Sequence, residues 1–118
     1  MKKFLVIFSL CFLILTPAFP WSGDVSTYQT LSGGIETVDA AGTAQVLASS
    51  TKCKRVSIKA ELDNTGNIFV GGSDVDKTTK NGIILDAGEA WIFYVDNLAD
   101  IWIDASVTGD GVHYTYEI

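Results

Sequence analysis

Apolar and polar side chains alternate along several short stretches of the chain. The clearest is residues 54–62, KRVSIKAEL, where every second residue from Val56 to Leu62 is apolar and the residues between them are polar. The stretches 89–95, 98–105 and 111–118 show the same period of two. This period is typical of antiparallel strands that bury one face and expose the other. We therefore predict strands at these four places.

Clusters of Gly, Asn and Asp separate the alternating stretches. They fall at 39–42, 63–66, 71–72, 81–82, 86–88, 96–97 and 108–111. Glycine adopts positive φ without strain and Asn or Asp tolerates it, so such clusters indicate turns. Shorter apolar runs at 34–39, 43–48, 67–70 and 83–86 bring the count to about eight strands. We expect residues 35–118 to form an all-β domain, a small antiparallel β-sandwich of jelly-roll-like architecture.

The N-terminal segment has a different pattern. Residues 1–21, MKKFLVIFSLCFLILTPAFPW, begin with two lysines after the first Met, continue with an apolar run over 4–15 and then carry small residues at 16–18. The run approaches the roughly 20 apolar residues of a membrane span only if it includes residues 16–21. We expect an apolar N-terminal helix that is either a cleaved secretory signal or a retained membrane anchor. Residues 22–34 are rich in Ser, Thr and Gly and predict a flexible linker or arm.

Charge limits the class of partner. The chain carries 8 basic and 14 acidic side chains, and without Lys2 and Lys3 six basic ones remain, which gives a net charge of −8. Such a domain repels phosphate backbones, so we expect no nucleic-acid binding. The acidic residues are dispersed, as on a solvated surface.

Cysteine usage excludes an internal disulfide in the domain. Cys11 lies in the leader, and Cys53 is the only other cysteine. Cys53 is either a small buried hydrophobic residue or a free or intermolecular thiol.

The sequence contains no recognisable catalytic motif, and we expect a protein that is not an enzyme and needs no cofactor. A Gly-x-Ser-x-Gly elbow and a phosphate-binding Gly-Lys-Ser/Thr loop are both missing, and His113 is the single histidine. Asp74 and Asp76 are weak candidates for a cation site, because the residues after them lack the glycine and closing glutamate of a calcium loop. We expect them to lie in a solvated hairpin loop.

Aromatic residues are the best candidates for contacts. Trp91 shares the parity of Phe93, so we expect it in the core. Trp102 has the opposite parity to its apolar neighbours and is expected to point outward, as an interface anchor, a sugar-stacking platform or a residue packed under a loop. We add Tyr94 and His113 as further interface candidates.

Five segments in a fixed order carry a resemblance to a known group of proteins. They are CKRVSIKA (53–60), NTGNIFVG (64–71), GIILDAGE (82–89), DNLADIWIDA (96–105) and GDGVHYTY (109–116). In this order they resemble small bacteriophage virion proteins of the capsid-decoration, head-fibre or minor capsid kind. The resemblance covers roughly residues 40–118, and it implies a compact β-sandwich displayed many times on or within a virus shell.

The resemblance implies a structural protein of the virion. Its partners would be other virion proteins, the major capsid protein first, and further copies of the chain. The leader departs from the pattern of tailed-phage head proteins, which assemble in the cytoplasm. A virion with an internal membrane, crossed by residues 4–21, would accommodate it. The alternative is an exported carbohydrate- or surface-binding module that stacks sugar on Trp102 or Tyr94.

Overall fold

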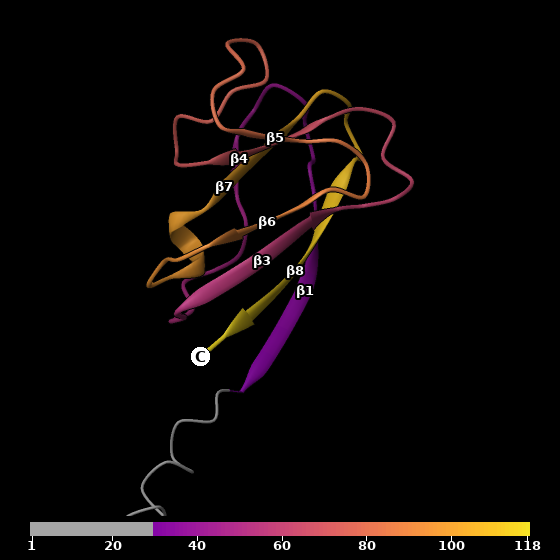
Figure 1. Ribbon diagram of the computed structural model, residues 1–118. Helices are drawn as coiled ribbons and strands as arrows, with labels where there is room; N and C mark the ends of the chain where they lie inside the picture. The colour runs from indigo at the N-terminus through magenta and orange to yellow at the C-terminus, as the bar shows by residue number, and fades with distance from the viewer. Residues whose placement is uncertain (1–29) are drawn as a thin grey trace, which may run out of the picture.

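Two antiparallel sheets of four strands pack face to face in the computed structural model of the chain (Figure 1). The structure describes residues 30–118, so the predicted leader and most of the predicted linker lie outside the described residues. The predicted all-β class and the expected number of strands are confirmed. The strands are β1 (Leu31–Thr37), β2 (Gln45–Val46), β3 (Arg55–Ala60), β4 (Ile68–Gly71), β5 (Ile83–Leu85), β6 (Ala90–Phe93), β7 (Trp102–Ala105) and β8 (Gly111–Glu117).

The strands pair as a long hairpin that is folded over on itself. One sheet has the order β1-β8-β3-β6 and the other β2-β7-β4-β5. Each strand of the first half pairs with its counterpart from the chain end, β1 with β8, β2 with β7, β3 with β6 and β4 with β5. Successive pairs alternate between the two sheets, so residues distant in sequence become neighbours within each sheet.

Several predicted boundaries are wrong, and two of them have a clear physical cause. β1 begins at Leu31, so residues 31–34 belong to a strand rather than to the linker. The glycines hide this strand in the sequence because they add no side chain to an alternating pattern. Gly34 must lack a side chain here, since a Cβ on it would lie 2.7 Å from the hydroxyl of Tyr114. Residues 98–100, predicted as the start of a strand, form one turn of 3₁₀ helix, η2 (Leu98–Asp100), because the Asn97 side chain accepts the Ala99 amide at 2.9 Å and caps it.

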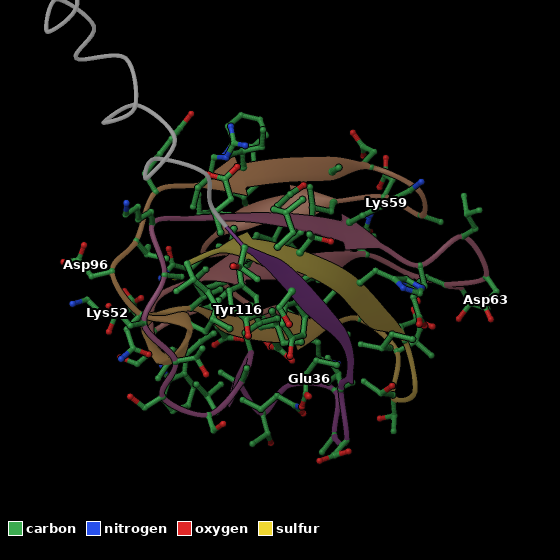
Figure 2. All side chains as sticks on the ribbon, turned by 90° about the horizontal axis from the view of Figure 1, so that it is seen from below. Glu36, Lys52, Lys59, Asp63, Asp96 and Tyr116 are labelled. Carbon is green, nitrogen blue, oxygen red and sulfur yellow. The ribbon has the colours of Figure 1, made fainter. Side chains whose placement is uncertain are left out.

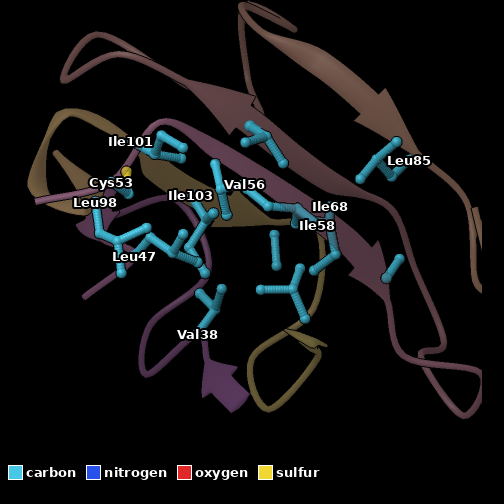
Figure 3. Packing of buried hydrophobic residues seen from close by; sticks show 14 residues of the cluster. Val38, Leu47, Cys53, Val56, Ile58, Ile68, Leu85, Leu98, Ile101 and Ile103 are labelled. Atoms are coloured by element: carbon cyan, nitrogen blue, oxygen red, sulfur yellow. The ribbon is translucent and has the colours of Figure 1, made fainter. Parts of the chain in front are cut away.

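The core lies between the sheets and follows the predicted alternation closely (Figure 3). Val56, Ile58 and Ala60 of β3 are fully buried, and Ile103 of β7 lies against them in the same cluster. Tyr114 and Tyr116 of β8 pack against this cluster, with their ring centroids 6.3 Å apart. Fully burying an aliphatic side chain contributes about 1.5–3 kcal/mol, so this layer is the main source of stability.

Some apolar residues, among them Leu62 and Trp91, are more exposed than their parity predicted. Leu62 is 78% exposed because β3 ends at Ala60, which leaves Leu62 in the following loop. Trp91 is 50% exposed, so its predicted core position is wrong. It lies directly opposite the buried Ile58 and shares that face, but β6 is the edge of its sheet and leaves the ring open to solvent.

A buried carboxylate fixes two loops over the outer face of the sheet β2-β7-β4-β5. Asp104 of β7 is fully buried although its parity directs it away from the core. Its Oδ1 accepts the amides of Gly42 and Ala105, and its Oδ2 accepts the amide of Lys77, each at 2.8 Å. The loops that contain Gly42 and Lys77 are thereby held against this sheet.

A second carboxylate joins two of the sequence motifs. Asp110 accepts the Gly66 amide at 2.8 Å and the Thr65 amide at 3.1 Å. Asn64 and Gly111 exchange two further hydrogen bonds, from the Asn64 amide to the Gly111 carbonyl and from the Gly111 amide to the Asn64 Oδ1. The Asn-Thr-Gly turn after β3 and the Gly-Asp-Gly turn before β8 therefore form one interlocked unit.

Replacing Asp104 will test how much the covering loops depend on it. We expect Asp104→Ala to lower the free energy of unfolding by about 3 kcal/mol, since buried amides lose a charged acceptor. Asp104→Asn, which keeps one acceptor oxygen, should lose roughly half as much. Denaturant titration measures both, with the exposed Asp63→Ala as the matched control, expected within about 0.5 kcal/mol of the original chain. An unchanged midpoint for Asp104→Ala would contradict this account.

Candidate interaction surface

The two sheets differ in what covers their outer faces. On the sheet β2-β7-β4-β5, Phe69 and Val75 are each only 4% exposed although neither belongs to the central core cluster. A Cβ on Gly71 of β4 would lie 3.7 Å from the Val75 side chain, so the loop after β4 packs against this sheet. With the Asp104 contacts, this sheet is covered on its outer side by the chain's own loops.

The outer face of the sheet β1-β8-β3-β6 carries no such cover among residues 30–118, and we call it the open face. Its side chains stand in three rows set by the strand register. The rows are Leu31–Glu117–Arg55, Gly33–Thr115–Ser57–Ile92 and Ile35–His113–Lys59–Ala90. Polar residues occupy the middle strands, whereas exposed apolar residues occupy the two edges, Leu31 and Ile35 on β1 and Ile92 on β6.

A shallow hollow of about 330 Å³ lies at one end of the open face. It is lined by Leu31, Arg55, Ser57, Ile92, Thr115 and Glu117. Arg55 donates to Glu117 across its floor, and this hydrogen bond is the main cause that raises the pKa of the Arg55 guanidinium. Both side chains are partly exposed, so the pair orients the surface more than it stabilises the fold.

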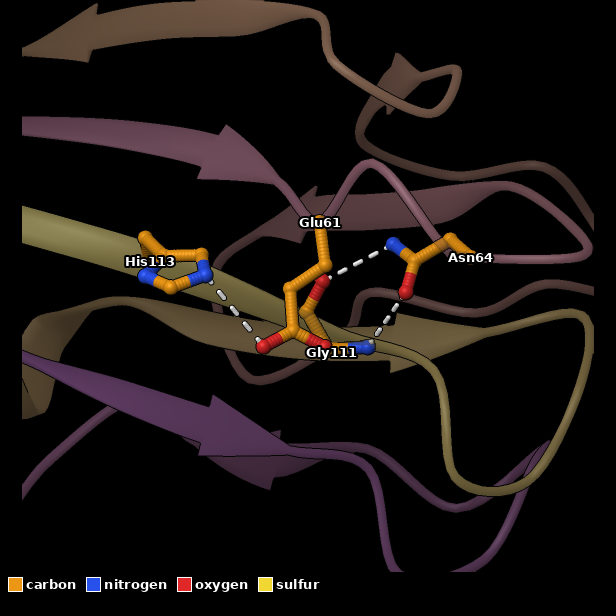
Figure 4. Close-up of polar contacts among 4 residues, drawn as sticks. All are labelled: Glu61, Asn64, Gly111 and His113. Atoms are coloured by element: carbon orange, nitrogen blue, oxygen red, sulfur yellow. Dashed lines mark hydrogen bonds and ion pairs between the residues drawn. The ribbon is translucent and has the colours of Figure 1, made fainter.

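A second hollow, of about 380 Å³, lies at the opposite end, where β3 leaves the sheet. It is lined by Lys59, Ala60, Glu61, Leu62, Asp63 and His113. His113 Nε2 lies 3.4 Å from Glu61 Oε1, beside the paired Asn64 and Gly111 (Figure 4). Lys59 and Asp63 project from this end of the domain, whereas Tyr116 lies toward its middle (Figure 2).

The structure brings two of the three predicted interface residues to the same side. His113 lies within the open face, and Tyr94, 78% exposed, follows β6 beside Arg55 at its margin. Trp102 lies on the other sheet, with the outward parity predicted, and is partly buried. It presents less surface to a partner than Tyr94 does. Its role as an interface anchor stays a prediction.

Sequence reasoning missed the apolar residues of the open face. Ile92 is 47% exposed and Ile35 is 59% exposed, and neither was a candidate. A signal for Ile92 was present, because Trp91, Ile92 and Phe93 are consecutive and must place apolar side chains on both faces of one strand. Ile35 carried no such signal, since its neighbours are glycine and glutamate.

The acidic pair after β4 has local structural contacts. Asp76 accepts the Thr78 amide at 2.7 Å through its side chain and exchanges backbone hydrogen bonds with Asn81, which closes a small hairpin. The carbonyl of Asp74 accepts the Asn81 side-chain amide at 2.9 Å. Within residues 30–118 no three side chains of the metal-ligating kind converge. The predicted hairpin loop is therefore present, and the Asp76 side chain has a local structural contact within it.

Open, shallow hollows of this kind suit docking better than catalysis. The open face offers one imidazole beside a carboxylate and one guanidinium–carboxylate pair, with apolar side chains at both edges. A reacting group would remain in contact with water there, which weakens the electrostatic effects that enzymes use.

No helix in the described part of the chain is long and apolar enough to cross a membrane.

Comparisons with known proteins give no assignment. Neither a family model, nor a curated protein, nor a solved structure matches the chain.

Cys53 is a buried residue, the first of the two predicted alternatives. It is 4% exposed, and its thiol donates to the Val95 carbonyl at 3.3 Å. Burial raises the pKa of the Cys53 thiol, and the carboxylates of Asp100 and Asp96 raise it further. The thiol is thus both inaccessible and protonated at neutral pH.

Thiol labelling will test this placement. In the native protein at pH 8, we expect a maleimide or disulfide reagent to modify Cys53 more than a hundredfold slower than in denaturant, as for a site whose opening costs about 3 kcal/mol. Peptide mass mapping distinguishes Cys53 from Cys11. Equal rates in the native and denatured protein would show that the thiol is accessible.

Proposed function

We propose that the chain is a non-enzymatic virion structural protein, a minor capsid or decoration component that acts through protein–protein contacts in a repeated assembly. The sequence resemblance to small phage virion proteins is the starting point. The strand pairing supports it, because the sheet orders β1-β8-β3-β6 and β2-β7-β4-β5 are those expected when a long hairpin folds into an eight-stranded jelly roll. Viral capsid domains use this architecture.

The observation that carries the proposal is the difference between the two outer faces. One sheet is covered by loops tied to Asp104, whereas the other exposes apolar side chains at both edges of a polar centre. Exposed apolar residues grouped around shallow hollows mark protein-interaction sites more often than active sites. The open face, with Tyr94 and His113, is therefore the proposed contact surface.

The proposed partners are other virion proteins, with the major capsid protein first among them, and further copies of the chain. An excess of acidic side chains disfavours contact with packaged nucleic acid, so the domain would face away from the genome. Residues 4–21 would reach a virion membrane if the leader is retained. The proposed location is accordingly the virion.

Incorporation into purified particles tests the proposal. We expect the intact chain to copurify with particles, and Ile92→Lys to lower its occupancy roughly tenfold, because a charge replaces an apolar contact worth at least about 1.4 kcal/mol. Val107→Lys, a similarly exposed apolar residue in the turn before β8, is the matched control and should incorporate normally. Occupancy is measured by quantitative mass spectrometry of gradient-purified particles.

Two results would contradict the proposal. Absence of the chain from particles would remove the virion role, and equal loss for Ile92→Lys and Val107→Lys would remove the open face as the contact surface. The intact mass also decides the fate of the leader: a mass that includes residues 1–20 means a retained anchor, and a mass beginning near Phe19 means a cleaved signal.

An exported carbohydrate- or surface-binding module is the second candidate, favoured by two exposed aromatic rings. Trp91 lies on the edge strand β6 and is 50% exposed, and Tyr94 comes just after this strand and is 78% exposed. Flat aromatic faces of this kind stack on sugars, and lectins also use jelly rolls. Saccharide-dependent quenching of tryptophan fluorescence that Tyr94→Ala or Trp91→Ala abolishes, in protein found outside cells without particles, would favour this candidate.

A further inference from the structure

We infer that the chain forms a two-fold symmetric dimer in which β1 of one copy pairs antiparallel with β1 of a second copy. The inference rests on the backbone of β1 and does not depend on the proposed virion role. It concerns the edge of the sheet β1-β8-β3-β6, where β1 has β8 on one side and no described strand on the other (Figure 1).

The hydrogen bonds that flank β1 show which backbone groups are directed to the open edge. The Val38 amide donates to the Asp110 carbonyl at 2.9 Å, and the Ile118 amide donates to the Thr30 carbonyl at 3.2 Å. Both contacts continue the β1–β8 register, in which hydrogen-bonded pairs alternate with non-bonded pairs. The even-numbered residues of β1 therefore bond to β8, and the odd-numbered residues direct their N–H and C=O groups outward.

Gln45 closes only the far end of this edge. Its side-chain amide donates to the Thr37 carbonyl at 2.9 Å and to Glu36 Oε1 at 2.6 Å, so Thr37 is already engaged. Within residues 30–118, the outward groups of Leu31, Gly33 and Ile35 have no such partner. An extended backbone is the partner that satisfies such a row of groups.

β1 lacks the features that protect sheet edges from pairing. The other three edge strands are short, with two residues in β2, three in β5 and four in β6, whereas β1 has seven. Residues 31–35, LSGGI, contain no charge and no proline. Charged residues, proline and shortness are the usual protections of an edge, so β1 is the open edge of this domain.

The sequence of β1 fits a second copy of itself. When Gly33 lies opposite Gly33 of the second copy, Leu31 lies opposite Ile35, and the three residues with free backbone groups pair only with one another. A register shifted by two residues would place Leu31 opposite Thr37, whose carbonyl already accepts a hydrogen bond from Gln45. Leu31 and Ile35 both belong to the open face, so the pairing also buries two apolar contacts, as cross-strand partners do.

The net charge argues for this contact over others between copies. Two acidic domains repel each other, and they approach most easily through an uncharged strip. In the proposed register Glu36 lies opposite Thr30 of the second copy, so no carboxylates meet. The contact is isologous, and it would extend the open face continuously across both copies.

Sedimentation of the full chain, in density-matched detergent where the leader requires it, tests the dimer. We expect twice the chain mass of 12.7 kDa, and a monomer for Ile35→Lys. Ile84→Lys on the edge strand β5, at 45% exposure, is the matched control and should remain dimeric. Circular dichroism should show that both variants are folded, since both side chains are exposed.

Cysteine cross-linking tests the register. In a chain with Cys11→Ser, Leu31→Cys and Ile35→Cys introduced together should oxidise to a disulfide-linked dimer, because paired Cα atoms about 5.5 Å apart fit a disulfide. Either substitution alone places identical cysteines about 13 Å apart and should not cross-link. Residues 31 and 35 of one chain are equally far apart, so no internal disulfide competes.

Three outcomes would overturn the inference. One is that the original chain is a monomer at about 100 μM, a concentration well above the μM dissociation constants of weak specific complexes. This outcome includes the case in which residues before 30 cover the edge. Another is an oligomer that Ile35→Lys leaves intact. The third is cross-linking by a single-cysteine variant as readily as by the pair. Particle incorporation measured separately keeps these results distinct from a failure of the proposed virion role.

Discussion

Buried carboxylates that accept backbone amides hold this small sandwich in shape. The core between the sheets is a single layer with no disulfide among the described residues, and long connections must be held by other means. Asp104 and Asp110 meet that need by bonding amides up to 62 residues away in sequence. Each carboxylate is compensated by hydrogen bonds rather than by a cation, which allows a charge to be buried without an ion pair.

The position of these two carboxylates also determines which surface remains free. Asp104 draws loops over one sheet and thereby buries Phe69 and Val75 outside the core. Asp110 acts at the end of the sandwich, where it ties the turn at Thr65 and Gly66 to the turn before β8 and draws no loop over a sheet face. The difference between the two outer faces therefore follows from where the loops are anchored.

The sequence was sufficient to predict the class, the strand count and the alternation of the central strands. Val56, Ile58 and Ala60 lie in a strand with neighbours on both sides, so parity alone decides their burial. Trp91 has the same parity, but the prediction that it is buried was wrong. The burial of a residue on an edge strand depends on how far the facing sheet extends over it, and that is a property of the tertiary structure. Asp104 was beyond prediction for the same reason: the amides that donate to it come from loops far apart in sequence, and its outward parity suggested solvent. Gly33 and Gly34 resembled a linker because the close approach of Tyr114 that requires them has no local signal.

A thin core and an uncovered sheet have a common consequence. A domain of this size buries a smaller fraction of its surface than a larger one does, and its margin of stability is correspondingly small. Any partner that binds only the folded state adds to that margin in proportion to the logarithm of its concentration over its dissociation constant. In a repeated assembly the local concentration of partners is high and constant, so the stability that the core lacks can be supplied by contacts. Leaving apolar side chains on an edge strand is a hazard for an isolated monomer, but in the proposed assembly the same side chains would be buried where the copies meet.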